Sequence, residues 1–303
     1  MTLYNHKTCC FTTVVYGWYQ DFIPIYIYSI LESFPQHYVK IFVLEELKQN
    51  NKESLEFIKQ NLSDRFEVVD NFTDLNWCEL PHKASMRFLL TREYFEGFDY
   101  VYFGDVDMLI YNVFNDNFVE YYLKHCEKTG LPFSNEYNYY ENKYRATGLH
   151  FIIKEPYFDA MDKIIEKMKQ PKPMGGWWNN SFRSQCFHNP QDPSYDEELL
   201  YHMISKTFDL RILTNYGRPN HGWHLGEYRY YYMNDYKSQY YFKLRAMLLA
   251  DKSFQKMSEI NDYQKIKNMI NTTTFKFLHS KIEGKAKNVV DLSTKIFDRK
   301  MFF

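Results

Sequence analysis

Glycine, proline and cysteine are scarce in this chain, and no long hydrophobic run occurs in it. Its 303 residues include only 11 Gly, 10 Pro and 5 Cys. So little glycine and proline excludes a collagen-like or low-complexity chain. The most apolar early run, Phe22–Leu31, is too short to cross a bilayer and contains Pro24. Because 45% of the residues are hydrophobic, we expect a folded protein with one large α/β domain and an appendage.

The cysteines also indicate the compartment. They are odd in number and have no Cys-x-x-Cys spacing, which favours reduced, structural thiols. The first ten residues lack the basic-then-apolar pattern of a secretory signal. We therefore expect a cytoplasmic protein.

Net charge is close to zero but unevenly distributed. The formal charge of -1 creates no field that would attract nucleic acid, so no nucleic-acid partner is expected. Residues 237–303 hold 14 Lys and Arg against 6 Asp and Glu, whereas the rest of the chain is acidic. From about Tyr236 onward the sequence predicts a basic, aromatic, helical C-terminal extension (236–303).

Apolar strands alternate with segments of helical length in the first half of the chain. This order predicts a mostly parallel sheet with right-handed crossovers, whose ligands bind beyond the carboxyl ends of the strands. The predicted strands are Cys9–Tyr16, Tyr38–Leu44, Phe66–Val69, Tyr100–Phe103, Gly148–Ile153 and Arg211–Thr214. The predicted helices are Asp21–Phe34, Ser54–Leu62, Lys83–Phe95, Tyr157–Met168 and Asp196–Ser205. A polar, Tyr- and Asn-rich stretch (134–145) and two long loops (171–195 and 215–229) lie between these elements.

Asp105 and Asp107 follow the strand at Tyr100–Phe103 through Gly104. One residue apart in an extended backbone, both carboxylates would point the same way and could share one cation. Oxygen ligands suit a hard ion such as Mg²⁺ or Mn²⁺. The alternative is an acidic turn that caps the strand.

Two segments around these aspartates resemble a known fold family. The "SMR" at Ser85–Arg87 and "FDYVYFGDVDMLI" at Phe98–Ile110 are similar to the core of GT-A-fold nucleotide-sugar glycosyltransferases. The retaining families 8 (glycogenin and lipopolysaccharide galactosyltransferases) and 6 (blood-group and α-1,3-galactosyl enzymes) are closest in pattern. The resemblance implies a Rossmann-like, mostly parallel mixed sheet flanked by helices. It also implies that Asp105 and Asp107 bind Mn²⁺ (or Mg²⁺) against the diphosphate of a UDP-sugar, with Arg87 in the donor site; otherwise Arg87 would be a helix-surface charge.

Two more segments match in the family's order. The opening "CCFTTVVYGWYQDFIPIYIYSIL" resembles the family 8 strand that holds uracil and ribose, with Thr13, Val15 and Tyr16 at the matching positions. "RATGLHFI" resembles the segment beside the donor sugar, with Thr147 and Gly148 aligned. Taken without the resemblance, Thr13, Val15 and Tyr16 are core strand residues.

A further segment, "YDEELLYHMI", resembles the family segment that carries an acidic or amide pair near the anomeric carbon. The resemblance gives Asp196 and Glu197 catalytic roles. Acidic residues at a helix N-terminus also stabilise the helix without any further role. "NHGWHLGEYR" resembles the family 8 segment that supplies a third metal ligand, which would be His224, with His221 as the competitor.

The resemblance implies the release of UDP, helped by basic groups such as Arg87, Arg218 or Arg229. A retaining outcome needs either a carboxylate nucleophile, for which Glu197 is the candidate, or same-face attack by the acceptor hydroxyl. In the long loop, Trp177, Trp178, Asn179 and Asn180 offer an acceptor-binding surface by stacking and hydrogen bonding, or else they pack in the loop.

Together the matches predict a GT-A catalytic domain over 1–235, with a donor half (about 1–110) and an acceptor half (about 111–235). The expected enzyme is a metal-dependent hexosyltransferase that moves galactose or glucose from a UDP-sugar to a glycan or glycolipid in cell-surface polysaccharide or lipopolysaccharide synthesis. The basic extension would rest on an anionic membrane at its inner face, or dock on the core. The alternatives are a non-catalytic nucleotide-sugar or glycan-binding protein and a nucleotidyltransferase, although the Gly-rich phosphate loop of the latter is missing.

Overall fold

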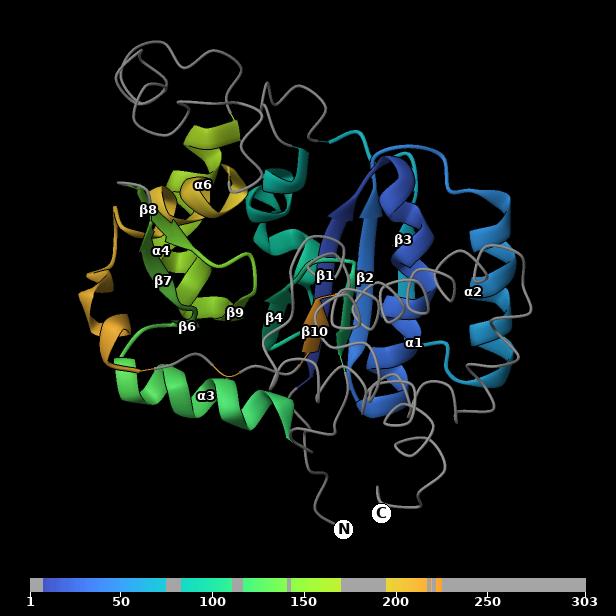
Figure 1. Cartoon of the computed structure of the whole chain (residues 1–303), viewed down its shortest axis with the longest axis horizontal. Helices are drawn as coiled ribbons and strands as arrows, with labels where there is room; N and C mark the ends of the chain where they lie inside the picture. The colour runs from blue at the N-terminus through green and yellow to red at the C-terminus, as the bar shows by residue number, and fades with distance from the viewer. Residues whose placement is uncertain are drawn as a thin grey trace, which may run out of the picture.

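A six-stranded mixed sheet forms the centre of the protein (Figure 1). The computed structural model describes residues 8–74, 83–110, 117–140, 143–169, 195–216, 219 and 222–224. The strand order is β3-β2-β1-β4-β9-β6; the first four are parallel, and β9 is antiparallel to both of its neighbours. These strands are β1 (Cys9–Val15), β2 (Tyr38–Val43), β3 (Phe66–Val69), β4 (Tyr100–Phe103), β6 (Phe133–Ser134) and β9 (His150–Ile153). The predicted α/β class with a mostly parallel sheet is therefore confirmed.

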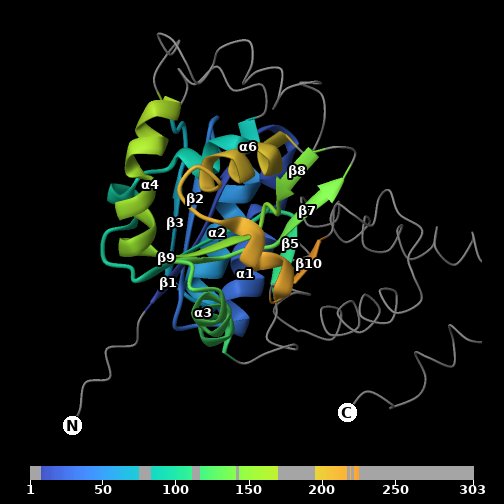
Figure 2. The same ribbon diagram turned by 90° about the vertical axis from the view of Figure 1, so that its left-hand side faces the viewer.

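Helices cover both faces of this sheet, because successive side chains of each strand point to opposite faces. In β1, Phe11 and Val15 pack into one core cluster, and Cys10 and Val14 pack into the other. The first cluster is closed by α1 (Ile23–Ser33), α2 (Gln49–Asn61) and α3 (Phe118–Thr129). The second is closed by the 3₁₀ helix η2 (Lys83–Leu89), α4 (Lys154–Lys169) and α6 (Tyr195–Ile204). In Figure 2 the strands run between α4 on one side and α1 on the other.

The sheet order places the topological switch point of the parallel strands between β1 and β4, and we call the region at their carboxyl ends the crevice. From β1 the chain moves outward through β2 and β3, and it then returns to add β4 on the opposite side of β1. Parallel sheets bind ligands beyond the carboxyl ends of the strands at such a switch point. Tyr16 follows β1 and Asp105 follows β4, so both lie at this point.

The sequence-based assignment was wrong for two elements. The expected helix Lys83–Phe95 is two 3₁₀ helices, η2 and η3 (Arg92–Phe95). Five successive residues of η2, 85–89, are buried, whereas an amphipathic helix would leave one face exposed. The expected strand Arg211–Thr214 lies in the 3₁₀ helix η5 (Leu210–Asn215), because the Asp209 side chain caps the Arg211 N–H and starts a turn.

Two small sheets and one helix were not predicted. The polar stretch at 134–145 contains the hairpin β7 (Tyr137–Tyr140) and β8 (Lys143–Ala146). Further along, β10 (Gly222–His224) pairs antiparallel with β5 (Met108–Ile110), although the two strands are more than a hundred residues apart. The missed helix is α3.

The remaining described 3₁₀ helix is η1 (Gly17–Phe22). Within the described ranges no helix is long and apolar enough to cross a membrane. The predicted extension 236–303 lies outside the described residues.

Phe118 anchors α3 to the sheet. It is fully buried, and its ring centroid lies 4.7 Å from that of Phe11, 5.0 Å from Tyr102 and 4.8 Å from Tyr122. Replacing it leaves a cavity between α3 and β1.

Phe118→Ala is expected to lower the free energy of unfolding by about 3 to 5 kcal/mol, because both transfer free energy and packing are lost. Urea denaturation measures the change. Tyr121→Ala on the same helix is the control: Tyr121 is 49% exposed, and the expected change is within about 0.5 kcal/mol. Equal losses in the two variants would contradict this packing.

Candidate functional site

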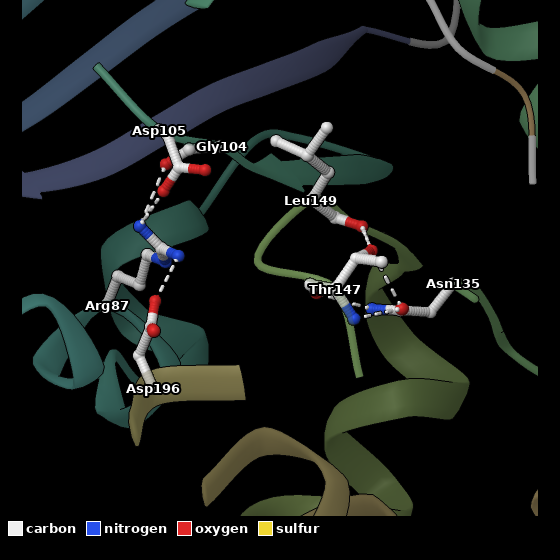
Figure 3. A network of polar contacts seen from close by, with 7 residues as sticks. All are labelled: Arg87, Gly104, Asp105, Asn135, Thr147, Leu149 and Asp196. Atoms are coloured by element: carbon white, nitrogen blue, oxygen red, sulfur yellow. Dashed lines mark hydrogen bonds and ion pairs between the residues drawn. The ribbon is translucent and has the colours of Figure 1, made fainter. Parts of the chain in front are cut away.

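A buried arginine joins three separate parts of the chain at the crevice. Arg87, on η2, is 3% exposed. Its Nη1 donates to Asp105 Oδ1 at 2.5 Å, and its Nη2 donates to Asp196 Oδ2 at 2.6 Å (Figure 3). Nη1 also approaches the Gly104 carbonyl at 3.4 Å. Burial alone would lower the Arg87 pKa, but attraction to Asp105 and Asp196 outweighs it and raises the pKa above its ordinary value, so this side chain stays charged.

We call the contacts of Arg87 with Asp105 and Asp196 the Arg87 bridge. Gly148 lies against this bridge and leaves room for it. A Cβ at this position would stand 2.4 Å from Arg87 Nη2 and 3.4 Å from Asp105 Oδ2. The Gly148 backbone also lowers the pKa of the Glu197 carboxyl. The position predicted to lie beside the donor sugar therefore contacts the same bridge.

Asn135 holds the turn that carries Thr147 and Gly148. Its Oδ1 accepts from the Thr147 N–H and hydroxyl, both at 3.0 Å, and its Nδ2 donates to the Thr147 carbonyl at 3.0 Å (Figure 3). Nδ2 also contacts His150 Nδ1 at 2.9 Å, and burial lowers the pKa of His150 to about 3, so this ring is neutral. These bonds fix the turn in position.

The Glu197 carboxyl at this site has a raised pKa. Together with Asp196 it occupies the first turn of α6, where the helix dipole favours negative charge. Burial, followed by repulsion from Asp196 and Asp105, nevertheless raises the Glu197 pKa from 4.5 to about 7. Arg87 and the Gly148 backbone offset only part of this rise. The crevice therefore carries a surplus of negative charge.

The end of β1 presents Tyr16 at the same crevice. The Lys83 ammonium lies 5.7 Å from the centre of the Tyr16 ring. Burial and repulsion from Tyr19 and Asp196 raise the Tyr16 pKa, so the hydroxyl is protonated at neutral pH. Thr13 and Val15, each 1% exposed, are buried within the strand. Of these three predicted donor contacts, Tyr16 alone is not fully covered.

Asp105 and Asp107 occupy a turn, which corrects the expected extended backbone. The Met108 N–H donates to the Asp105 carbonyl at 3.1 Å, an i to i+3 bond typical of a β-turn. The Asp105 side chain is 27% exposed, whereas Asp107 is 4% exposed. Among the described side chains no group of three or more His, Cys, Asp and Glu residues forms a metal site.

The small sheet β5–β10 brings His224 to this turn. In its register the backbone of His224 lies opposite Met108, one residue after Asp107. Carboxylate oxygens suit Mn²⁺ or Mg²⁺, but the His224 side chain lies outside the described part of the structure, so its role as third ligand stays a prediction. The competitor His221 lies outside the described residues, as do Trp177, Trp178, Asn179 and the arginines at 218 and 229.

Two polar residues that support the site were not predicted. Asn135 is a single buried amide within a polar stretch, and no periodic pattern marks it. Glu198 is 2% exposed, and its carboxylate lies 3.7 Å from Arg145 Nε. It is the third of the three acidic residues in the first turn of α6, and this contact joins α6 to the β7–β8 hairpin. The run of acidic residues was visible in the sequence, but its division between two partners was not.

Comparisons with known proteins find only distant similarity. No protein-family model matches the chain, and a search of curated proteins finds no match. A solved active-site mutant of LgtC is 13% identical over 55% of this chain and 66% of that chain, just under two thirds of its length, with a TM-score of 0.36. Galactosyltransferase LgtC in complex with donor and acceptor sugar analogs is 15% identical over 63% of this chain and 82% of that chain, with a TM-score of 0.33. A structure described as a transferase is 14% identical over 71% and 90%, with a TM-score of 0.36. Similarity at this level assigns neither a family nor an activity to the chain.

Gly148→Ala is expected to displace Arg87 and to lower the free energy of unfolding by about 1 to 3 kcal/mol, because the new methyl group overlaps the guanidinium. Urea denaturation measures the change. Asn138→Ala, at an exposed position of the neighbouring hairpin, is the control and should change stability by no more than about 0.5 kcal/mol. A Gly148→Ala variant that unfolds at the wild-type urea concentration would show that the approach of Arg87 does not constrain this position.

Glu197→Gln is expected to flatten the dependence of stability on pH. Because folding raises the Glu197 pKa from 4.5 to about 7, the folded state holds more protons than the unfolded state between these values. Stability from this group is therefore present at low pH and is lost as pH rises through about 7.

Melting temperatures measured from about pH 5 to about pH 8 test this linkage. The wild type should lose stability relative to Glu197→Gln across this range. Glu56→Gln, on the exposed face of α2, corrects for the general effect of removing a carboxylate. Parallel curves for the wild type and Glu197→Gln would contradict the raised pKa.

Proposed function

We propose that this chain is a metal-dependent glycosyltransferase of the GT-A fold, which transfers galactose or glucose from a UDP-sugar to a hydroxyl of a glycan or glycolipid. The observation that carries the proposal is the Arg87 bridge. It joins "SMR", "DVD" and "YDEE", three segments that resemble the donor-site motifs of families 6 and 8, through Arg87, Asp105 and Asp196. A structural ion pair alone would not require all three motifs to meet at the switch point of the sheet.

The crevice between β1 and β4 suits a nucleotide donor. Tyr16, at the end of β1, offers an aromatic face with Lys83 beside it. Thr13 and Val15 belong to β1, the strand proposed to hold the uracil and ribose, and Tyr16 directly follows it. Thr147 and Gly148 would lie beside the donor sugar, since their turn touches both Arg87 and Asp105.

Asp105, Asp107 and His224 would hold the metal ion. When bound, Mn²⁺ or Mg²⁺ supplies Lewis-acid stabilisation of negative charge on the diphosphate. Repulsion from Asp196 and Asp105 adds to burial in raising the Glu197 pKa, and neighbouring carboxylates of this kind attract a cation.

The proposed reaction breaks the bond between the anomeric carbon and the diphosphate oxygen. UDP leaves with the electron pair, and the positive charge of Arg87 opposes the negative charge that develops there. In one route the Glu197 carboxylate attacks the anomeric carbon, and the acceptor hydroxyl then displaces it. In the other, the acceptor hydroxyl attacks from the face that UDP leaves. Both routes retain the anomeric configuration, and the pKa of about 7 leaves about half of Glu197 ionised near neutral pH.

The remaining parts of the proposal concern partners and place. Trp177, Trp178 and Asn179 would contact the acceptor. The basic extension 236–303 would place a cytoplasmic enzyme on the inner face of an anionic membrane, where glycolipid acceptors for lipopolysaccharide or other surface polysaccharides are built.

UDP release from a panel of UDP-sugars, measured with and without Mn²⁺, tests the function. We expect release that requires Mn²⁺ and that falls by about 100-fold or more in Asp107→Asn, because a metal carboxylate is lost. Asp64→Asn, an exposed aspartate far along the chain from the site, should release UDP at the wild-type rate.

Asp107 is buried, so the melting temperature of its variant is measured alongside, and Mn²⁺ binding by the wild type is measured by calorimetry. Tight UDP-sugar binding without turnover would indicate a nucleotide-sugar-binding protein instead. Metal-independent release would contradict the assignment of the aspartate pair.

A further inference from the structure

Four tyrosines form an aromatic cluster on the β7–β8 hairpin and the adjoining face of α6. Tyr139 and Tyr144 lie directly opposite each other in the hairpin, with ring centroids 4.6 Å apart. Tyr144 stacks on Tyr201 of α6 at 5.1 Å with 13° between the ring planes, and Tyr137 lies 5.8 Å from Tyr201. We call these four residues the tyrosine platform.

Two rings of the platform are about half exposed. Tyr139 is 59% exposed and Tyr144 is 46% exposed. Scattered exposed aromatics are common on protein surfaces, but adjacent ones in a defined stack are typical of a binding surface. The platform is therefore poorly explained as core packing.

The platform borders the candidate site along two elements. On α6, Tyr201 stands four residues after Glu197, so both lie on the same face of the helix, one turn apart. On the hairpin, Tyr144 comes four residues before Gly148, which lies against the Arg87 bridge. Figure 2 shows the hairpin projecting next to α6. A glycan that extends from the site along α6 and the hairpin would therefore reach the tyrosines.

Contacts of the residues after Tyr144 hold the hairpin in place. Arg145, between Tyr144 and the site, lies 3.7 Å from the buried carboxylate of Glu198 on α6. Ala146 is fully buried, and Thr147 is bound by Asn135. A surface that is already rigid loses little entropy when a ligand binds.

The chemistry of the platform fits a neutral sugar. A pyranose ring has a face of C–H groups that can stack on an aromatic ring, and its hydroxyl rim can hydrogen-bond to the tyrosine hydroxyls. Two ion pairs lie beside the platform, Arg145 with Glu198 and Arg211 with Asp209 at 2.5 Å. No excess charge of either sign in these pairs would select a phosphorylated or acidic ligand.

We infer that Tyr139 and Tyr144 form a stacking subsite for a neutral sugar residue of the acceptor glycan, remote from the hydroxyl that is modified. The assignment of this glycan as the acceptor rests on the proposed function. The subsite would bind extended acceptors more tightly than their terminal fragments, since only the former reach both the crevice and the platform.

Binding of neutral glucose- and galactose-based oligosaccharides, from mono- to hexasaccharides on an array, tests the inference. Three full-length proteins are compared: wild type, Tyr139→Ala/Tyr144→Ala, and Tyr121→Ala. We expect the wild type to bind at least one oligosaccharide, and the double variant to bind it about tenfold or more weakly, because two stacking rings are removed. Tyr121→Ala, which removes a similarly exposed tyrosine on α3, should bind as the wild type does.

A Tyr139→Phe/Tyr144→Phe variant separates stacking from folding, since it keeps both rings and should retain most of the binding. If the Ala variant melts below the temperature of the array, each single Ala variant takes its place. Equal binding by the wild type and the Ala variants overturns the inference, as does a wild type that binds no oligosaccharide. A double variant that only converts a dimer to a monomer in size-exclusion chromatography would also overturn it, by assigning the platform to self-association.

UDP release by the wild type, measured with water and with the bound oligosaccharide as acceptors of the hexosyl group, distinguishes this inference from the proposed function. Glycan binding through the tyrosines without UDP release would contradict the transferase and leave a glycan-binding platform. Metal-dependent UDP release combined with tyrosine-independent glycan binding would support the transferase and exclude the platform.

Discussion

The candidate site depends on one buried ion triad, Arg87 between Asp105 and Asp196. A guanidinium that is almost fully covered is costly unless carboxylates compensate it, and removing Arg87 would in turn leave Asp105 and Asp196 without the positive charge that they share. The triad therefore ties together η2, the turn after β4 and the start of α6, which enter the fold from three distant parts of the chain. The same contact that stabilises this corner of the protein also fixes the relative positions of the carboxylates that would carry the chemistry.

The electrostatic state of the site follows from an imbalance in this triad. Burial, followed by repulsion from Asp196 and Asp105, raises the Glu197 pKa to about 7, and the single charge of Arg87 offsets only part of this rise. A divalent cation at the turn would reduce the repulsive part of this shift. The proposed metal site and the perturbed glutamate thus depend in part on the same carboxylates.

The proposed donor and acceptor regions are mechanically joined by the segment from Tyr144 to Gly148. Its first residue belongs to the tyrosine platform, and its last touches Arg87. Asn135 binds Thr147 in between, and the neutral His150 completes that hydrogen-bond network. Packing and hydrogen bonds along so short a stretch leave little freedom between a bound sugar and the carboxylates.

The apolar runs in the sequence, and the Gly, Pro and polar residues between them, determined the strands β1 to β4, their parallel order and the position of the aspartates after β4. These features are local in the chain. Tertiary structure alone decided which of the acidic residues meet Arg87, because that contact spans 109 residues. It also decided the turn at Asp105, the register that brings His224 beside Met108 and the division of Asp196 and Glu198 between two arginines. Pairings of this kind arise from burial and from strand register between remote segments, and neither leaves a periodic trace in the sequence.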